Sequence, residues 1–467
     1  MNVDCEYPFE RLMGKNMQKE KYIRNAIMHL NSKAVLKNKI EESEIEPLVK
    51  KVVDDLQSPT PMYDFTSYKT LKIKQGDKKR PVKKYEDFST EQILCQCMKQ
   101  MLDRKLRIEY PNRNEIIHQF FGFLKAVKTI SDFTIIKIDF KDYFNSVSSR
   151  YVYEKYIREK MDDREECALL EQFVNQTEYA YTGLATSNLL AEIVALDFDE
   201  QVQMELTGLG LIFYKRYIDD TVIILNRYHS EDSCNKILDC CLKKVFYDPK
   251  YQEYQLCKTV FNDEKKKIIT KREINADVAM DFLGYEIFFS KTQKKLKLQY
   301  GITKEKREKY ACRMEEFLEE YIDDEKNIEL LRHRILAFSS RVVYRRKRFS
   351  KSIWRAKGFI NNYGELRYFL ETDLLHPDTK DFLKNMIKDA FIKKSIPVPE
   401  FISNTLDKKG YNLFYNMKAN RTILLVENIG YDKKGLERIC RQIGINIDDK
   451  EYEALVREYL IKTKVGY

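Results

Sequence analysis

The feature that most constrains this chain is a pair of adjacent carboxylates inside its densest run of β-branched and aromatic residues. The run is LIFYKRYIDDTVIIL, residues 211–225, and it is apolar on both sides of Asp219 and Asp220. This composition favours β-strands on each side of the acids. The sequence therefore predicts a β-hairpin that holds the two carboxylates at its tip and points them outward.

The same four letters, YIDD, occur a second time at residues 321–324. That copy follows EKREKYACRMEEFLEE and precedes EKNIELLRHRIL, and both flanks have helical periodicity. Its acids are most simply a solvated helix end or an N-cap. The tetrapeptide alone therefore does not identify a metal site. Whether its acids form one depends on the strands around it.

Adjacent carboxylates repel each other unless a positive charge lies between them, and Mg²⁺ is a cation that carboxylates and substrate phosphates bind together. A third carboxylate, Asp139, ends the apolar segment FTIIKIDF at residues 133–140. The apolar character of that segment predicts a central strand in the same sheet. We expect Asp139, Asp219 and Asp220 to share two ions about 3.5–4 Å apart, which would activate a primer hydroxyl and neutralise a leaving pyrophosphate.

Composition bounds the remaining possibilities. The chain has 467 residues, enough for two or three domains, and carries a formal net charge of +10. It has only 15 glycines and 10 prolines, which excludes collagen-like and linker-rich architectures, and its 43 % apolar content excludes an intrinsically disordered chain. A net charge of +10 is compatible with a nucleic-acid partner but does not by itself identify one.

Neither the N-terminus nor the cysteines indicate secretion or metal binding. The first residues, MNVDCEYPFERLMGK, lack the pattern of a secretory signal, and no apolar run is long enough to span a membrane. We expect a cytoplasmic protein without membrane segments. The ten cysteines are scattered without the paired spacing of a zinc site, so we expect reduced thiols in the core.

Changes in pattern along the chain predict three regions. Residues 1–60 form a charged, helical N-terminal extension, which ends at a Ser-Pro-Thr-Pro break. Residues 61–302 contain a basic hairpin at 68–84, a helix at about 90–105, and strands at 133–140, 211–225, 281–289 and 295–300. Residues 303–467 have the pattern of long charged helices.

Basic residues are concentrated between 341 and 357, where eight of 17 positions are Lys or Arg, with aromatic residues between them. This mixture is suited to binding phosphates and stacking on bases. A solvated basic helix face is the alternative. The candidate nucleic-acid contacts in this segment are Arg341, Arg345, Arg346, Arg348 and Trp354.

Seven segments between residues 60 and 300 together resemble reverse transcriptases. IDFKDYFNSV (138–147), TGLATSNLLAEI (182–193) and RYIDDTVII (216–224) resemble the first three catalytic motifs, in that order. LCKT (256–259) and FLGYEI (282–287) look like the motifs that close the palm and form the primer grip. KIKQGDKKRPV resembles the fingers hairpin, and YPNRNEII (110–117) is similar to the segment before the first motif in retron and group II intron enzymes.

This resemblance implies an α+β fold, with the fingers and palm of a right-hand polymerase followed by an all-helical C-terminal domain in place of a standard thumb. It also implies roles for individual residues. Asp139, Asp219 and Asp220 would bind Mg²⁺, or Mn²⁺ as a substitute, with the backbone carbonyl of Phe140. Lys258 would protonate the leaving pyrophosphate. The residues implied to contact the incoming dNTP are Lys74 and Arg80, with Lys72 as the alternative partner, together with Phe144 beneath the sugar and Gly183, and Gly284 would belong to the primer grip.

The second motif departs from the retroviral and intron form, because Thr182-Gly183 replaces Gln-Gly. This form looks like the abortive-infection and defence-associated group of bacterial reverse transcriptases, and it puts the usual templating contact of the Gln in doubt. The resemblance implies dNTPs, an RNA template or non-coding RNA, a DNA product and a homo-oligomer as partners. Whether priming uses a nucleic acid or a protein hydroxyl, which would leave the DNA covalently attached, stays open.

Three other functions compete with this interpretation. A retron- or intron-like reverse transcriptase would copy a dedicated RNA outside defence. An RNA-cleaving toxin is suggested by the R-x4-H pattern of Arg24 and His29, although Arg113 and His118 repeat that pattern within the polymerase-like segment. A non-catalytic scaffold is expected to have lost some of the acids, and all three are present.

Overall fold

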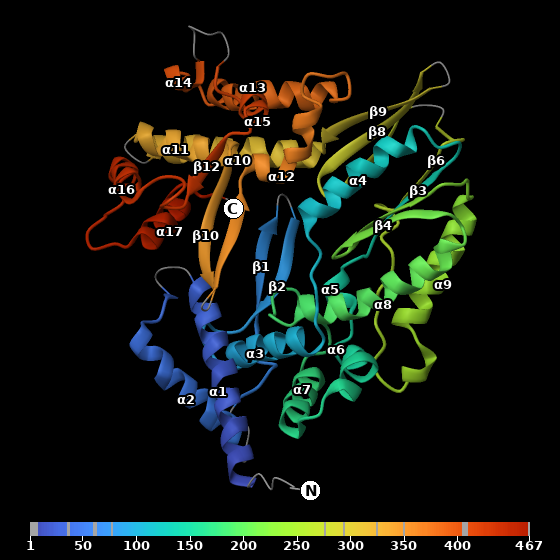
Figure 1. Cartoon of the computed structure of the whole chain (residues 1–467), viewed down its shortest axis with the longest axis vertical. Helices are drawn as coiled ribbons and strands as arrows, with labels where there is room; N and C mark the ends of the chain where they lie inside the picture. The colour runs from blue at the N-terminus through green and yellow to red at the C-terminus, as the bar shows by residue number, and fades with distance from the viewer. Residues whose placement is uncertain are drawn as a thin grey trace, which may run out of the picture. The chain divides into compact units, whose positions relative to one another are not determined.

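The computed structural model describes residues 8–34, 38–58, 63–75, 78–274, 277–292, 295–323, 326–348, 351–403 and 410–465. The side chains of residues 8–18, 74–75, 78, 292, 347–348 and 351 lie outside this description. The chain divides into two compact units (Figure 1). Unit 1 comprises Met1–Asn112 and Ile130–Lys271, and unit 2 comprises Arg113–Thr129 and Arg272–Tyr467. The ranges 1–60, 61–302 and 303–467 expected from the sequence do not coincide with these units.

Unit 1 contains an antiparallel four-stranded sheet in the order β4-β5-β3-β6. All six residues of β3 are buried, which confirms the central position expected from its apolar sequence. Helix α8 packs against α9 and contacts β4. The strands of this sheet are β3 (Thr134–Asp139), β4 (Leu211–Tyr217), β5 (Asp220–Leu225) and β6 (Lys267–Thr270).

The remainder of unit 1 is mainly helical. Its elements are α1 (Pro8–Lys33), α2 (Glu42–Gln57), β1 (Lys69–Gln75), β2 (Lys78–Lys84), α3 (Thr90–Lys105), α5 (Tyr143–Ser146), α6 (Ser149–Val152), η2 (Tyr153–Ile157), η3 (Arg158–Lys160), α7 (Arg164–Gln176), α8 (Ser187–Thr207), α9 (Glu231–Phe246) and η4 (Pro249–Tyr251). The β1–β2 hairpin, the helix at 90–105 and the N-terminal helices confirm the sequence predictions for these segments. The side chain of Ser89 accepts a hydrogen bond from the N–H of Gln92, which explains why α3 begins at Thr90.

Unit 2 combines helices with two three-stranded sheets, in the orders β7-β8-β9 and β11-β10-β12. Its strands are β7 (Val278–Phe282), β8 (Tyr285–Thr292), β9 (Lys295–Ile302), β10 (Arg341–Arg348), β11 (Lys351–Lys357) and β12 (Thr422–Leu425). Its helices are α4 (Arg113–Val127), α10 (Lys304–Asp323), α11 (Ile328–Ser339), α12 (Phe359–Tyr363), η5 (Gly364–Tyr368), α13 (Pro377–Lys393), α14 (Glu400–Ser403), α15 (Leu413–Lys418), α16 (Lys433–Gln442) and α17 (Tyr452–Lys462).

Two sequence predictions in unit 2 are wrong. The region beyond 302 is not all-helical, because β10, β11 and β12 form a sheet there. In β10 the side chains of Val342 and Tyr344 are buried, whereas those of Arg341, Val343 and Arg345 on the other face are more exposed, which is the pattern of a half-buried strand. The segment 281–289 is not one strand either, since a two-residue turn at Leu283 and Gly284 divides it into β7 and β8.

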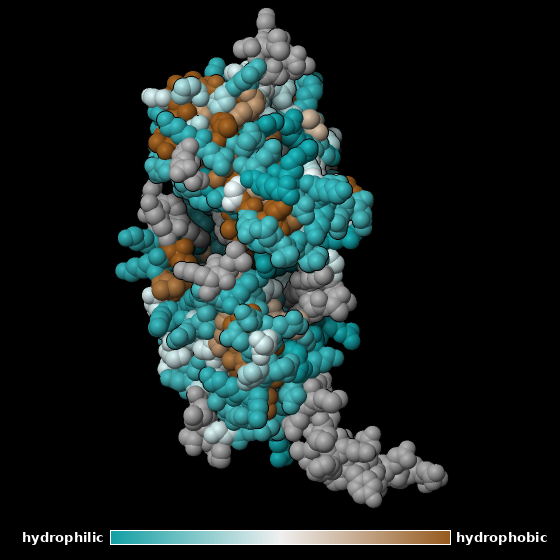
Figure 2. Space-filling view, turned by 90° about the vertical axis from the view of Figure 1, so that its left-hand side faces the viewer, coloured by the Kyte–Doolittle hydropathy of each residue, from teal (hydrophilic) through white to brown (hydrophobic). Residues whose placement is uncertain are grey.

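The surface agrees with the high content of charged residues. Figure 2 shows hydrophilic residues over most of one face, with apolar residues in small separate groups. Among the described residues, no helix is both long enough and apolar enough to cross a membrane. The described cysteines are all free thiols, and most of them are buried.

Candidate active site

The turn between β4 and β5 carries Asp219 and starts β5 at Asp220. Tyr217 pairs with Asp220 across the hairpin, so Ile218 and Asp219 form a two-residue turn. The sequence predicted this hairpin with both acids at its tip, whereas Asp220 is the first residue of β5. The φ angle of Ile218 is 62°. A β-branched residue rarely adopts this left-handed conformation, which costs about 1–3 kcal/mol and persists only where the surroundings enforce it.

A buried ion network holds this turn. Arg216 on β4 is 5 % exposed, and its Nη1 donates to the carbonyl of Ile218 at 3.0 Å. Its Nη2 donates to Oε1 of Glu192 at 2.7 Å and to Oδ2 of Asp199 at 2.8 Å, both on α8. Burial alone would lower the pKa of Arg216, but the two carboxylates raise it well above its usual value. The arginine therefore stays charged and ties the strained turn to α8.

Asp139 lies directly opposite Asp220, because the register of β3 and β5 pairs these two residues. Like charges at opposite positions of a sheet destabilise it unless they are compensated. Lys137, two residues earlier on the same face of β3, is 1 % exposed, and its Nζ lies 3.9 Å from Oδ1 of Asp220. This buried lysine supplies part of the compensating charge.

A second lysine contacts Asp139 from the loop before β6. The Nζ of Lys265 lies 3.1 Å from Oδ1 and 3.0 Å from Oδ2 of Asp139, and Nδ2 of Asn262 donates to Oδ1 at 3.2 Å. Partial burial lowers the pKa of Lys265, but its hydrogen bond to Asp139 and the charges of the three aspartates outweigh burial and raise it. An ammonium group therefore lies where the sequence predicted a cation.

Asp219 has a raised pKa, mainly because it is buried and secondly because Asp139 is negative. The positive charges of Lys265 and Arg80 offset only part of this effect. The carboxylate of Asp219 is thus electrostatically under-compensated, and a nearby cation would stabilise its ionised form.

The donor set consists of carboxylate oxygens, which suits a hard cation such as Mg²⁺. In the part of the chain that the structure describes, however, no three His, Cys, Asp or Glu side chains converge closely enough to hold a metal ion. Lys265 contacts Asp139, and its side chain is 51 % exposed, so it has room to move away. The residues fit a cation in charge and chemistry, with Lys265 in the position of a competitor.

Other residues predicted for the site lie on neighbouring elements of unit 1. The N–H of Phe140 donates to the carbonyl of Asp219 at 3.1 Å. Phe144, on α5, is only partly buried, whereas its neighbour Tyr143 is in the core. The segment before Gly183 is held from two sides, since Oδ1 of Asn145 accepts from the N–H of Thr182 and the carbonyl of Thr182 accepts from β2.

Gly183 is required by this close approach. Its φ angle is 109°, and a β-carbon there would lie 2.4 Å from the carbonyl oxygen of Lys83 and 2.4 Å from a methyl group of Val82. Any larger residue would push the turn away from β2. The structure thus brings the second-motif turn, α5 and the base of the β1–β2 hairpin together.

Two residues predicted to bind the nucleotide phosphates, Lys72 and Arg80, lie on different faces of the β1–β2 hairpin. Lys72 pairs with Pro81, and Arg80 pairs with Ile73, so the register places Lys72 and Arg80 on opposite faces of the ribbon. Arg80 shares its face with Val82, which approaches Gly183. Lys74 lies in β1, but its side chain is outside the described part of the chain.

Lys258 is exposed, and its ammonium group lies 4.8 Å from the centre of the Tyr179 ring. The ammonium group that contacts Asp139 is that of Lys265. The role of Lys258 in protonating pyrophosphate stays a prediction.

Two predicted nucleic-acid elements belong to unit 2. Residues 341–357 form the β10–β11 hairpin rather than a helix face, and Arg345 lies 4.5 Å from the Trp354 ring, which is 47 % exposed. Arg341 starts β10, Arg346 is partly buried, and the side chain of Arg348 is outside the described part. Nucleic-acid binding by these residues stays a prediction.

Gly284 forms the β7–β8 turn with Leu283, and both have positive φ angles, 84° and 49°. This combination is typical of the tight turn that matches the twist of a hairpin. Nη2 of Arg113 donates to the carbonyl of Leu283 at 2.5 Å, and Nη1 donates to the carbonyl of Asn362 at 3.0 Å. Arg113 therefore has a structural role, which disfavours its R-x4-H pattern as a nuclease site.

The other R-x4-H pattern is also occupied by structural contacts. Arg24 on α1 donates from Nε and Nη2 to the two carboxylate oxygens of Glu46 at 2.6 Å each. His29 is 9 % exposed. Arg24 is engaged by Glu46 at the surface and His29 is buried, so the two do not form an exposed nuclease pair.

Sequence reasoning missed Arg216, Glu192, Lys137 and Lys265. A signal existed for three of them: Glu192 is an acid within the apolar stretch of α8, Arg216 is in the third motif, and Lys137 interrupts the apolar strand β3. Buried charges of this kind require partners. Lys265 carries no such signal, because it is the first of three consecutive lysines in a charged segment.

No protein-family model matches the chain, and no curated protein matches it. Among solved structures, apo telomerase from Candida tropicalis is similar, with 14 % sequence identity and a TM-score of 0.32. The match covers 53 % of this chain and 51 % of the telomerase chain, so this chain spans about half the length of that protein.

Proposed function

We propose that this chain is a DNA polymerase of the reverse transcriptase type, which adds dNTPs to a growing strand by nucleotidyl transfer. The observation that carries the proposal is the register that sets Asp139 opposite Asp220, with Asp219 in the adjoining turn. The order of the seven sequence segments that resemble reverse transcriptases supports the same assignment.

In this proposal Asp139, Asp219 and Asp220 hold two Mg²⁺ ions, or Mn²⁺ as a substitute, with the carbonyl of Phe140. When bound, these ions activate the attacking hydroxyl and neutralise charge on the leaving pyrophosphate. The raised pKa of Asp219, caused mainly by burial and then by Asp139, is the electrostatic reason that a cation would bind there.

Neighbouring residues position the nucleotide in this proposal. Arg80, whose charge already acts on Asp219, is suited to hold triphosphate oxygens with its planar guanidinium. Phe144 lies against the sugar and excludes a 2′-hydroxyl, and Gly183 allows the backbone to approach the nucleotide closely. Lys258 donates a proton to pyrophosphate.

The sequence resemblance supplies the proposed partners and setting. These are an RNA template or non-coding RNA, a DNA product that is free or attached to the protein, a homo-oligomer, and a role in bacterial antiphage defence in the cytoplasm. A retron- or intron-like enzyme that copies a dedicated RNA is the alternative. The structural contacts of Arg24 with Glu46 disfavour an RNA-cleaving toxin.

Incubation of the full chain with Mg²⁺ and labelled dNTPs, with and without RNA, tests the proposal. We expect labelled DNA that resists RNase, and a ratio of kcat/KM for dNTP over rNTP that falls about 10- to 100-fold in Phe144→Val, because the smaller side chain admits the 2′-hydroxyl. Absence of DNA synthesis under all primer conditions, or a wild-type preference for rNTPs, would contradict the proposal.

A further inference from the structure

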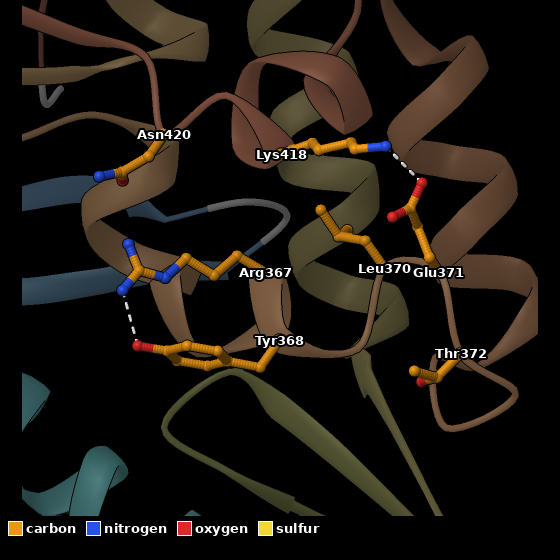
Figure 3. Close-up of a pocket in the computed structure, with 7 residues that line it drawn as sticks. All are labelled: Arg367, Tyr368, Leu370, Glu371, Thr372, Lys418 and Asn420. Atoms are coloured by element: carbon orange, nitrogen blue, oxygen red, sulfur yellow. Dashed lines mark hydrogen bonds and ion pairs between the residues drawn. The ribbon is translucent and has the colours of Figure 1, made fainter.

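Unit 2 contains a pocket that the proposed polymerase site does not use (Figure 3). It lies between η5 with the turn after it and the end of α15, and its volume is about 470 Å³. Small-molecule sites have volumes in this range. The lining residues are Arg367, Tyr368, Leu370, Glu371, Thr372, Lys418 and Asn420.

An aromatic ring and a guanidinium form one wall of the pocket. The side chain of Tyr368 is 54 % exposed, and the guanidinium carbon of Arg367 lies 4.7 Å from the centre of its ring. Nη2 of Arg367 also donates to the Tyr368 hydroxyl at 2.6 Å. The pair is therefore fixed in place before any ligand binds, with a large apolar surface beside a positive charge.

The positive charge at this wall has no acidic partner. Within the described ranges, no carboxylate lies within 4.0 Å of the guanidinium of Arg367 or of Arg341. Burial, and next the positive charge of Arg367, lower the pKa of Arg341, so the two groups lie close enough to repel each other. Arg341 does not line the pocket, but its charge adds to the positive potential near Arg367, which favours an anion beside the Arg367 guanidinium.

The opposite wall is neutral, because Lys418 forms an ion pair with Glu371. Figure 3 shows these two side chains reaching toward each other, whereas Arg367, Tyr368 and Asn420 extend to the other side of the pocket. The pocket therefore has one cationic end and one neutral end.

Asn420 adds a specific polar group at the cationic end. Its Oδ1 is buried and has no hydrogen-bond partner among the residues that the structure describes. A buried acceptor without a partner is unfavourable, and a ligand N–H would satisfy it. An aromatic surface, a guanidinium group and an amide acceptor match the base, the phosphate and the base edge of a nucleotide.

We propose that this pocket binds one nucleotide unit, with the base stacked on Tyr368, the phosphate held by Arg367, and a base N–H donated to Asn420. The unit comes either from a single strand of nucleic acid or from a free nucleotide. The single-strand form rests on the proposed polymerase function. It would extend the surface of the β10–β11 hairpin, where Arg345 and Trp354 form a second arginine–aromatic pair.

Binding measurements on the full chain without divalent ions test this site separately from catalysis. The probes are labelled (dT)12 and (rU)12 for a strand and labelled ATP for a free nucleotide. We expect Tyr368→Ala to weaken binding of the strand or of ATP about 5- to 100-fold, because each stacked base contributes in this range. Tyr368→Phe keeps the ring and should retain affinity within about threefold.

Arg367→Ala should lower the slope of log affinity against log salt by about 0.7 if the ligand is a single strand. Tyr431→Ala is the matched control, since Tyr431 is also an exposed tyrosine of unit 2, at 41 %. Circular dichroism verifies that each variant folds.

A loss confined to (dT)12 and (rU)12 supports a strand ligand, and a loss confined to ATP supports a free nucleotide. Unchanged binding of all three probes in folded Tyr368→Ala and Arg367→Ala would overturn the proposal, even if the wild type makes DNA. A specific loss of ATP binding in a chain that makes no DNA would keep the pocket as a nucleotide site and reject the polymerase.

Discussion

The tetrapeptide Tyr-Ile-Asp-Asp has opposite surroundings at its two positions in this molecule. At 217–220 it forms a strained hairpin turn whose Ile218 carbonyl accepts from buried Arg216. At 321–324 its first three residues end helix α10, where Ile322 is 47 % exposed and Asp323 is exposed, and Asp324 lies outside the described residues. The same letters therefore produce a compact acidic site in one place and a solvated helix end in the other.

The difference lies in what the flanking residues bury. Around the first copy, strands β4 and β5 pair with each other, and β5 also pairs with β3, which brings Asp139 opposite Asp220. Around the second copy, helical periodicity leaves Asp323 exposed at the end of α10. The pKa of a carboxylate is perturbed, as functional sites require, where the fold buries it beside another charged group. The first copy has these surroundings.

The largest expected effect comes from removing each pair of acids in turn. Asp219→Ala/Asp220→Ala should reduce DNA synthesis by more than about 10³-fold, because metal ligands contribute several kcal/mol to the transition state. Asp323→Ala/Asp324→Ala is the matched control and should keep wild-type activity. Primer extension measures both, and loss of activity in the second variant alone would reverse our assignment.

The ion network of Arg216, Glu192 and Asp199 should stabilise the first copy of the tetrapeptide, and the second copy has no equivalent contribution from the exposed pairs of α10. Arg216→Met leaves Glu192 and Asp199 buried without their partner, which typically costs about 3–5 kcal/mol. Hydrogen exchange of peptides from 211–225 should accelerate accordingly. Lys304→Met removes an exposed pair with Glu308 on α10 and should change exchange little. Equal effects of the two substitutions would show that Arg216 does not hold the turn.

A smaller effect is expected from Lys265, whose ammonium group contacts Asp139: its removal should lower the Mg²⁺ requirement of the enzyme. Lys265→Met removes a positive charge that competes for Asp139, so the Mg²⁺ concentration for half-maximal synthesis should fall about 3- to 10-fold. Lys243→Met, an exposed lysine on α9, is the control. An unchanged or higher Mg²⁺ requirement in Lys265→Met would mean that Lys265 does not compete with the metal.

The smallest effect concerns pH and stability without divalent ions. Burial, and then Asp139, raise the folded-state pKa of Asp219, so its contribution to stability is complete below its unfolded pKa of about 3.9 and is lost as pH rises through the folded value. Asp219→Asn should therefore melt at a slightly higher temperature than wild type at pH 7.5 and at the same temperature below pH 4.

Asp323→Asn, at the exposed end of α10, is the control for this melting experiment. An advantage of Asp219→Asn that persists unchanged at low pH would show that the ionised carboxylate of Asp219 is not the cause.

The sequence predicted the parts of the fold with strong local signals. The apolar run of β3 and the hairpin of β4 and β5 were identified because strand composition is dense there, and the register then follows from the pairing. The β10–β11 hairpin was missed because its charge suggested a solvated helix face, although alternating Val342 and Tyr344 bury one side. The turn at Leu283 was missed because leucine rarely has a positive φ.

The sequence predicted the three aspartates of the site. It did not predict the positively charged side chains that contact or surround them. Carboxylates in apolar strands are visible in a sequence, whereas the partner of a carboxylate depends on long-range packing. Lys265 is 126 residues from Asp139 in the chain. The pairing of β3 with β6 and the backbone hydrogen bonds between residues 139–141 and 260–262 bring its loop to the acids. The placement of Lys72 and Arg80 on opposite faces of the β1–β2 ribbon likewise follows from the register of the two strands.

The most direct test of the account is to locate a bound divalent cation along the chain. Fe²⁺ replaces Mg²⁺ in such sites, and with ascorbate and peroxide it generates hydroxyl radicals that cleave the nearby backbone, which mass spectrometry can map. We predict cleavage next to Asp139 and next to Asp219, suppressed by excess Mg²⁺ and absent in Asp219→Asn/Asp220→Asn. Cleavage next to Asp323 instead, or no cleavage near Asp139 and Asp219, would contradict the account.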